Sequence, residues 1–157
     1  MRDPGPSAVR DPTFRMHSLS HCTTAVCEAT AEAAFAFLAD PSRLGSWALG
    51  CWEAEPVGAG TVRGASLFDA STAYVRADPE PARLLVDFAV GADPDELVHR
   101  ISARVIPGPV LGFEESSSVV TLLAWRPAGM PDDRWSRLVV SHEAEILLLR
   151  ARIEEAA

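Results

Sequence analysis

The chain has 157 residues, of which 48% are hydrophobic and 23% charged, and its formal net charge is −8 at pH 7. This composition is typical of one folded domain with a sizeable core, and it excludes a disordered chain. The acidic balance argues against nucleic-acid binding, which needs a basic surface for the phosphates. Every basic residue is arginine, which excludes a Schiff base on lysine. No apolar run approaches the roughly 18 residues that span a bilayer, so we expect a cytoplasmic protein.

The first fifteen residues differ in character from the rest. Residues 1–15 contain prolines and charges of both signs without an apolar period. We therefore expect a flexible N-terminal segment there, followed by a single domain over residues 16–157. Met16 stands directly before the first predicted strand, which favours Met16 as the natural start. A mature N-terminus at Met1 or Arg2, found by N-terminal sequencing, would contradict that expectation.

The three cysteines do not predict a disulfide framework, because the set is odd and sparse. Cys22 and Cys27 fall in one predicted strand, roughly 16 Å apart, too far to pair or to share a metal ion. No spacing of ligand-type residues predicts a metal site, and nothing in the sequence indicates a cofactor.

The predicted structure begins with a strand and two short helices. Residues 17–28 are rich in Thr, Cys and Val, which favours a strand. Thr30 is a suitable N-cap for a helix over residues 31–39. Pro41 ends that helix, because the residue before a proline is disfavoured in the helical region, and it opens a second short helix over residues 41–44.

Turn residues divide the next stretch into six strands with short connections, which is typical of an antiparallel meander. The predicted strands cover residues 51–57, 61–68, 72–77, 83–90, 97–106 and 117–125. Pro131 and Asp132 then begin the last element. Because no Gly or Pro follows them, we expect one long helix up to Ala157.

The long helix carries apolar residues on two faces. Its inner stripe comprises Trp135, Leu138, Val139, His142, Ile146, Leu149 and Ile153. The opposite stripe comprises Val140, Ala144, Leu147, Leu148 and Ala151. One stripe is expected to pack on the sheet. The other needs a cover, which the short helices, the loops or a second subunit of a homodimer could supply.

Alternation along the strands assigns their inward faces. It places Phe88, His99 and Ile101 on the inner face. Trp125 also falls in the set that matches an inner face, although apolar neighbours blur the alternation in that strand. A curved sheet held off a long helix is expected to leave an apolar cavity, which is the usual character of a small-molecule site.

The order of strand, two short helices, six strands and long helix is that of the helix-grip fold. Residues 29–41, followed by Trp47, resemble the opening of the START-like, polyketide cyclase/dehydrase superfamily, which contains the birch-pollen-allergen fold. The turn at residues 58–61 resembles the turn between the second and third strands of that superfamily. The resemblance covers residues 17–155. It implies an α+β helix-grip fold with a seven-stranded curved antiparallel sheet around a long C-terminal helix.

Members of the superfamily bind lipids, polyketides and aromatic compounds, cyclise polyketides, or act as chaperone cofactors and ribosome-associated proteins. They share no catalytic motif, so the resemblance implies a hydrophobic ligand and no particular reaction. We favour binding of a hydrophobic small molecule in the cavity. The alternatives are a polyketide aromatase/cyclase and an interaction protein that dimerises with a filled cavity.

We expect the ligand to contact side chains on the inner faces, namely Trp47, Phe68, Phe88, His99, Ile101, Trp125, Leu138, His142 and Ile146. His99 and His142 are candidate acid and base groups for an aldol-type cyclisation if both face one cavity. The plainer interpretation is that each histidine is a hydrogen-bonded core residue and that the aromatic side chains belong to the ordinary core. Both arrangements are the more common ones in proteins. Glu143 and Glu145 are interpreted as edge or surface charges.

Overall fold

The computed structural model describes residues 19–157, so the predictions made for residues 1–15 lie outside the described part of the chain. The predicted strands and helices over the described part are all present, with ends shifted by a few residues. In chain order the elements are β1 (Ser20–Cys27), α2 (Ala31–Ala39), the short 3-10 helices η1 (Pro41–Ser46) and η2 (Leu49–Cys51), β2 (Trp52–Gly58), β3 (Thr61–Ala65), β4 (Thr72–Glu80), η3 (Pro81–Arg83), β5 (Leu85–Gly91), β6 (Val98–Pro107), η4 (Gly108–Leu111), β7 (Ser118–Trp125) and α3 (Asp132–Ala156).

The two short helices after β1 begin and end where their capping residues dictate. Thr30 is the N-cap of α2, and its side-chain oxygen accepts a hydrogen bond from the Ala33 backbone N–H at 3.2 Å. Asp40 follows the last residue of α2, and its carboxylate accepts from the Ser42 N–H at 2.9 Å. The same aspartate therefore ends one helix and caps the next, which fixes the sharp change of direction at Pro41.

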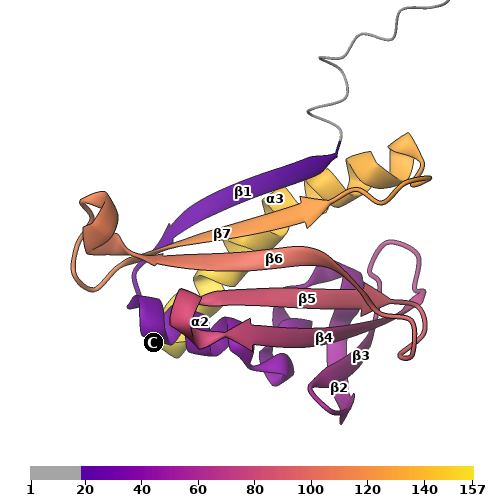
Figure 1. The fold of residues 1–157 in the computed structure, drawn as a ribbon, viewed down its shortest axis with the longest axis horizontal. Helices are drawn as coiled ribbons and strands as arrows, with labels where there is room; N and C mark the ends of the chain where they lie inside the picture. Colours follow the sequence, from indigo (N-terminus) through magenta and orange to yellow (C-terminus); the bar gives the residue numbers. More distant parts are fainter. Residues whose placement is uncertain (1–18) are drawn as a thin grey trace, which may run out of the picture.

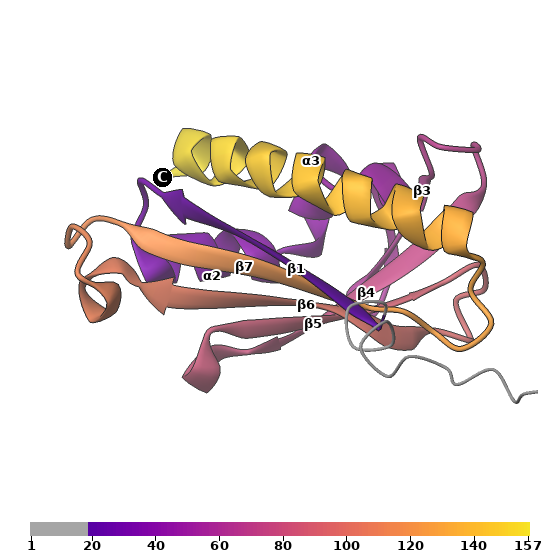
Figure 2. The same cartoon turned by 90° about the horizontal axis from the view of Figure 1, so that it is seen from above.

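All seven strands form one antiparallel sheet in the order β1-β7-β6-β5-β4-β3-β2. Strands β2 to β7 follow one another as neighbours, and β1 returns to pair with β7, so that Ser20 lies opposite Trp125. The sheet curves, and α3 runs along its inner face (Figure 1). The view from above shows α3 crossing over the strands (Figure 2), and α2 contacts both α3 and the strands β5 to β7. The predicted architecture is confirmed.

The main core lies between the inner face of the sheet, α2 and α3. Phe88 on β5 meets Trp47, which follows η1, in an edge-to-face contact with ring centroids 5.9 Å apart. From α3 the core receives Ile146, Leu149 and Ile153, three members of the predicted inner stripe. The inner stripe of the long helix is thus confirmed as the face that packs on the sheet.

The opposite stripe of α3 faces away from the sheet. Val140 is 69% exposed and Leu147 is 63% exposed, whereas Leu148 is only partly buried. Within residues 19–157, Leu148 packs against the main core, and the other members of the stripe are exposed. In the same part of the chain, no helix is both long and apolar enough to cross a membrane.

A β-bulge in β6 reverses the predicted direction of His99. Phe88 pairs with Ile101, but the next residue of β5, Ala89, pairs with His99, so Arg100 is an extra residue in β6. An extra residue inverts the alternation of side chains on one side of the bulge. His99 therefore lies on the outer face although Ile101 lies on the inner one. The prediction that His99 points inward is wrong, because strict alternation assumes a regular strand.

The inward face of β7 is also the reverse of the predicted one. Val120, Leu122 and Ala124 pair with Val105, Ala103 and Ile101 of β6 and are buried on the inner face. Trp125 belongs to the outer set and is 44% exposed. The strand is apolar on both faces, so its alternation alone does not distinguish inside from outside.

Candidate functional site

A buried cluster of titratable side chains lies between β1 and α3. It consists of His21 on β1 and of His142 and Glu145 on α3, and we call it the histidine–glutamate cluster. His142 is 1% exposed, and its ring meets the ring of His21 edge-on with centroids 5.9 Å apart. The spacing of three residues puts His142 and Glu145 on one side of the helix, both facing the interior.

His142 is the most unusual member, because neither ring nitrogen has a hydrogen-bond partner among the described residues. The nearest carboxylate atom, Glu145 Oε2, lies 3.8 Å from Nε2, which is too long for a hydrogen bond. Burial, together with the charge of His21, lowers the pKa of His142 to about 4. The imidazole is therefore neutral at physiological pH, with one nitrogen able to donate and the other able to accept.

Glu145 is held in place by the backbone of η2. Its Oε1 accepts a hydrogen bond from the Leu49 N–H at 2.7 Å, and the side chain is almost fully buried. Burial raises its pKa to about 7, against the opposing effect of the amides of Leu49 and Gly50. The interpretation of Glu145 as an edge or surface charge is wrong, because η2 covers the part of α3 on which it lies.

His21 closes the cluster toward the edge of the sheet. Its Nε2 lies 2.8 Å from Glu143 Oε1, and the Thr23 hydroxyl donates to the other oxygen of that carboxylate at 3.4 Å. Glu143 itself is exposed, in agreement with its predicted surface position. His21 lies in the stretch of residues 17–28 that the sequence predicts only as a strand. The available signal was its place in the alternating set His21, Thr23 and Cys27, which faces α3.

The structure brings only part of the predicted site together. His142 and Ile146 lie on the inner side of α3, and Trp47 and Phe88 lie in the core beneath it. Ile101 and Leu138 are partly buried and pack together near the start of α3, against Trp135. These six residues remain candidates for ligand contact, whereas the other three predicted residues do not face the interior.

Phe68 lies outside the region between the sheet and α3, because β3 ends earlier than predicted. The strand stops at Ala65, and a tight turn follows in which the Asp69 carboxylate accepts from the Ser71 N–H at 3.0 Å. Phe68 sits in this turn and is 50% exposed. The hydrogen bond between the Asp69 side chain and the Ser71 backbone favours a turn over continuation of the strand, because it satisfies a backbone donor locally.

His99 takes part in an ion-pair network on the outer face of the sheet. Its Nε2 lies 2.7 Å from Asp78 Oδ2, and Arg76 donates from Nε to the same carboxylate at 2.9 Å. The Arg76 guanidinium and, after it, the His99 ring hold the pKa of Asp78 below its usual range. His99 and His142 therefore do not form the acid–base pair that the alternation favoured.

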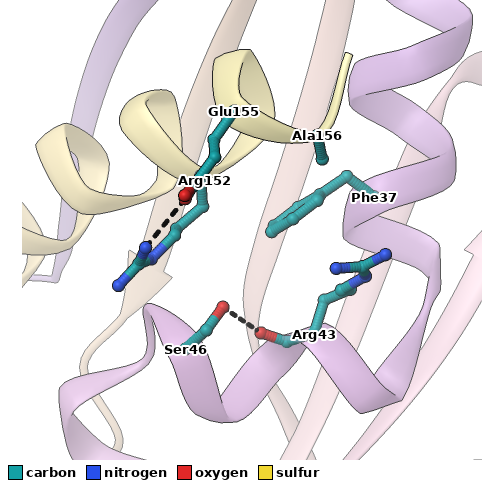
Figure 3. A pocket seen from close by; sticks show the side chains of 6 residues that line it. All are labelled: Phe37, Arg43, Ser46, Arg152, Glu155 and Ala156. Carbon is teal, nitrogen blue, oxygen red and sulfur yellow. Dashed lines mark hydrogen bonds and ion pairs between the residues drawn. The ribbon is translucent and has the colours of Figure 1, made fainter.

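A surface pocket of about 300 Å³ opens between η1, α2 and the last turns of α3 (Figure 3). Arg43 stacks over the ring of Phe37, with Cζ 5.7 Å from the centroid, and Arg152 Nη1 lies 2.8 Å from Glu155 Oε2. Ser46 completes the polar wall by donating to the Arg43 carbonyl oxygen at 2.6 Å. This pocket is charged and open, and it is distinct from the apolar interior that the sequence predicts as a binding site.

Two of the three cysteines are unsuited to chemistry because they are buried. Burial raises the pKa of the Cys27 and Cys51 thiols to about 11, so both stay protonated and unreactive at physiological pH. Within residues 19–157, no three His, Cys, Asp or Glu side chains are grouped as a metal site would require. The histidine–glutamate cluster is the candidate functional site.

Comparison with known proteins places the fold. No protein-family model and no curated protein matches the sequence. The chain is similar to the ZhuI aromatase/cyclase from Streptomyces sp. R1128, with a TM-score of 0.60 and 17% identity over 87% of this chain and 93% of that chain. It is also similar to the Aha1 dimer from Colwellia psychrerythraea, with a TM-score of 0.61 and 15% identity over 87% and 96%. A third similar structure, Ara h 8.0201, has a TM-score of 0.56 and 11% identity over 87% and 97%.

At these identities the likeness concerns the fold and not the ligand or the reaction. It extends over 87% of this chain and nearly the whole of each of these three structures. With its antiparallel sheet wrapped around one long C-terminal helix, the chain has the helix-grip fold that it shares with these three structures.

Proposed function

We propose that the protein binds a hydrophobic small molecule between α3 and the sheet, with a hydrogen bond to the ring of His142. The observation that carries this proposal is a fully buried imidazole with two nitrogens free of partners in the described residues. Leaving a buried donor or acceptor without a partner is costly, so a carbonyl or hydroxyl of a ligand would stabilise His142 strongly.

The surroundings of His142 fit a ligand that is otherwise apolar. Ile146 lies one turn further along α3. Phe88 and Trp47 belong to the same core cluster as Ile146. Ile101 and Leu138 continue the apolar surface toward the start of α3. A site with few polar groups amid apolar side chains takes its affinity from burial and its orientation from the polar group.

The expected result of replacing His142 is a loss of affinity for a neutral carbonyl compound. With methyl dodecanoate as the probe, His142→Leu should weaken binding about tenfold, the value of one buried hydrogen bond. Titration of the intrinsic tryptophan fluorescence measures the affinity. His99→Leu is the matched control, because His99 lies on the outer face, and it should bind as the wild type does. Equal weakening by both variants, or absence of binding to the wild type, would contradict the proposal.

Acid–base catalysis of a cyclisation is the second candidate function. The specific observation in its favour is a carboxyl with a pKa of about 7 lying 3.8 Å from a neutral imidazole. A group that exchanges its proton near neutral pH is suited to general acid–base work. Glu145→Gln should then abolish turnover of a cyclisable polyketone while probe binding persists. Turnover that survives this change would remove the enzyme candidate.

A homodimer through the exposed stripe of α3 is the proposed partner interaction. The stripe consists of Val140, Ala144, Leu147, Leu148 and Ala151, and its two largest exposed members are Val140 and Leu147. Leu147→Glu would place a charge in the middle of such an interface and should give monomers in light scattering. An unchanged mass would remove this face from consideration.

A further inference from the structure

Arginines surround the start of α3, and only some of them have acidic partners. Arg126 pairs with Asp132 and Arg137 pairs with Asp133, which occupies both aspartates of the first helical turn. Arg134 and Arg100 have no ion pair among residues 19–157, although the chain carries a net charge of −8. The charge of Arg134 acts on the nearby carboxylate of Asp69, whose pKa it helps to lower, whereas the partly buried Arg100 has no carboxylate at ion-pair distance among residues 19–157.

Arg100 is the more informative of the two because it is partly buried. The β-bulge makes it the extra residue of β6, next to Ile101, which packs against the small hydrophobic cluster that contains Trp135 of α3. Its Nε is buried and has no hydrogen-bond partner in the described residues. Burial and, after it, the charge of Arg134 lower the pKa of Arg100, so the two guanidinium groups act on one another. A buried cation without a counter-charge is costly, and an anion would relieve that cost.

We propose that Arg100 and Arg134 bind a carboxylate at one end of the hydrophobic ligand. The inference rests on the proposed function, because it names the class of that ligand as an amphiphilic acid. A guanidinium presents Nε–H and an Nη–H side by side, and this edge matches the two oxygens of a carboxylate. The arginines of the surface pocket are less suited, since Arg152 already has Glu155 and Arg43 lies 3.6 Å from Asp40.

The sheet register sets the distance between this carboxylate site and the histidine–glutamate cluster. Ala124 of β7 pairs with Ile101 of β6 on one side and with His21 of β1 on the other. Two neighbouring strand spacings separate Ile101 from His21, which is roughly 10 Å. The position of Arg100 in β6 is thus two strands away from His21, so the ligand class named here is a hydrophobic acid whose carboxylate binds away from the histidine–glutamate cluster.

The test compares dodecanoate with methyl dodecanoate, which share a chain and differ in charge. The wild type should bind dodecanoate about tenfold more tightly than the ester, and Arg100→Gln should reduce this preference to about twofold or less. Affinity for the ester should be unchanged in Arg100→Gln, which also shows that the variant is folded. Arg104→Gln is the matched control, because Arg104 is an exposed residue of the same strand, and it should keep the full preference.

The outcomes separate the two proposals. If the wild type binds acid and ester equally, or if the preference survives in Arg100→Gln, the carboxylate site is wrong while binding of a hydrophobic molecule stands. If neither compound binds to the wild type, both proposals fail. A preference lost in Arg100→Gln and also in Arg104→Gln reflects overall charge and overturns the assignment to Arg100.

Discussion

Acidification from pH 6.5 to pH 4 is expected to lower the free energy of unfolding through His142 by about 3 kcal/mol. In the unfolded chain the imidazole takes up its proton near 6.5, whereas in the folded protein it does so only near 4. Between these values the unfolded state binds more protons, so stability falls as the pH falls. Above 6.5 the contribution of His142 no longer changes.

Glu145 acts in the opposite direction and must be separated from His142. Its pKa is raised from 4.5 to about 7, so the folded state binds more protons in that window, and stability falls as the pH rises through it. The measurement is therefore the difference in unfolding free energy between wild type and His142→Leu, taken from urea denaturation across pH 4 to 7. His21 and Glu143 also face this site, and both are kept in the two proteins compared. His99→Leu serves as the control, and a pH-independent difference for His142→Leu would contradict the account.

Phe88→Ala is expected to destabilise the protein by about 4 kcal/mol, because it removes a buried ring and leaves a cavity. Phe88 is 2% exposed and packs edge-to-face on Trp47 at the centre of the core. Phe68→Ala should change stability by no more than about 0.5 kcal/mol, because half of that ring already faces solvent in a turn.

The two phenylalanines thus form a matched pair that tests the corrected inner face. Urea unfolding of both variants gives the two free energies of unfolding. The two can be compared when the free energy falls with the same slope against urea concentration. Comparable losses would mean that Phe68 packs in the core as the sequence predicted. A small loss at Phe88 would mean that its ring does not pack on Trp47 beneath α3 as the structure shows.

Long periodic elements could be predicted from the sequence because one face repeats over many residues. The inner stripe of α3 continues for about five turns, so single exceptions do not hide it, and α2 follows from the cap at Thr30. The order of the strands followed from turn residues. The stripe, the cap and the turns depend on residues that are close to one another in the chain.

The candidate site depended on contacts between distant parts of the chain, and there the prediction was partial. His142 was recognised because it interrupts an apolar stripe. The bulge at Arg100 depends on pairing with β5, so no local pattern reveals that His99 turns outward. Burial of Glu145 depends on η2, which lies nearly a hundred residues earlier in the chain. Alternation in β7 failed for a different reason, since both of its faces are apolar.

The most direct test of the central claim is to follow the imidazole nitrogen resonances of His142 and His99 by NMR while methyl dodecanoate is added. A ligand that hydrogen-bonds His142 should shift the resonances of His142 in a saturable manner and leave those of His99 unchanged. The positions of the two rings, one buried beneath α3 and one on the outer face, make each a reference for the other. A saturating titration that leaves the His142 signals in place, or that moves only His99, would contradict binding between α3 and the sheet.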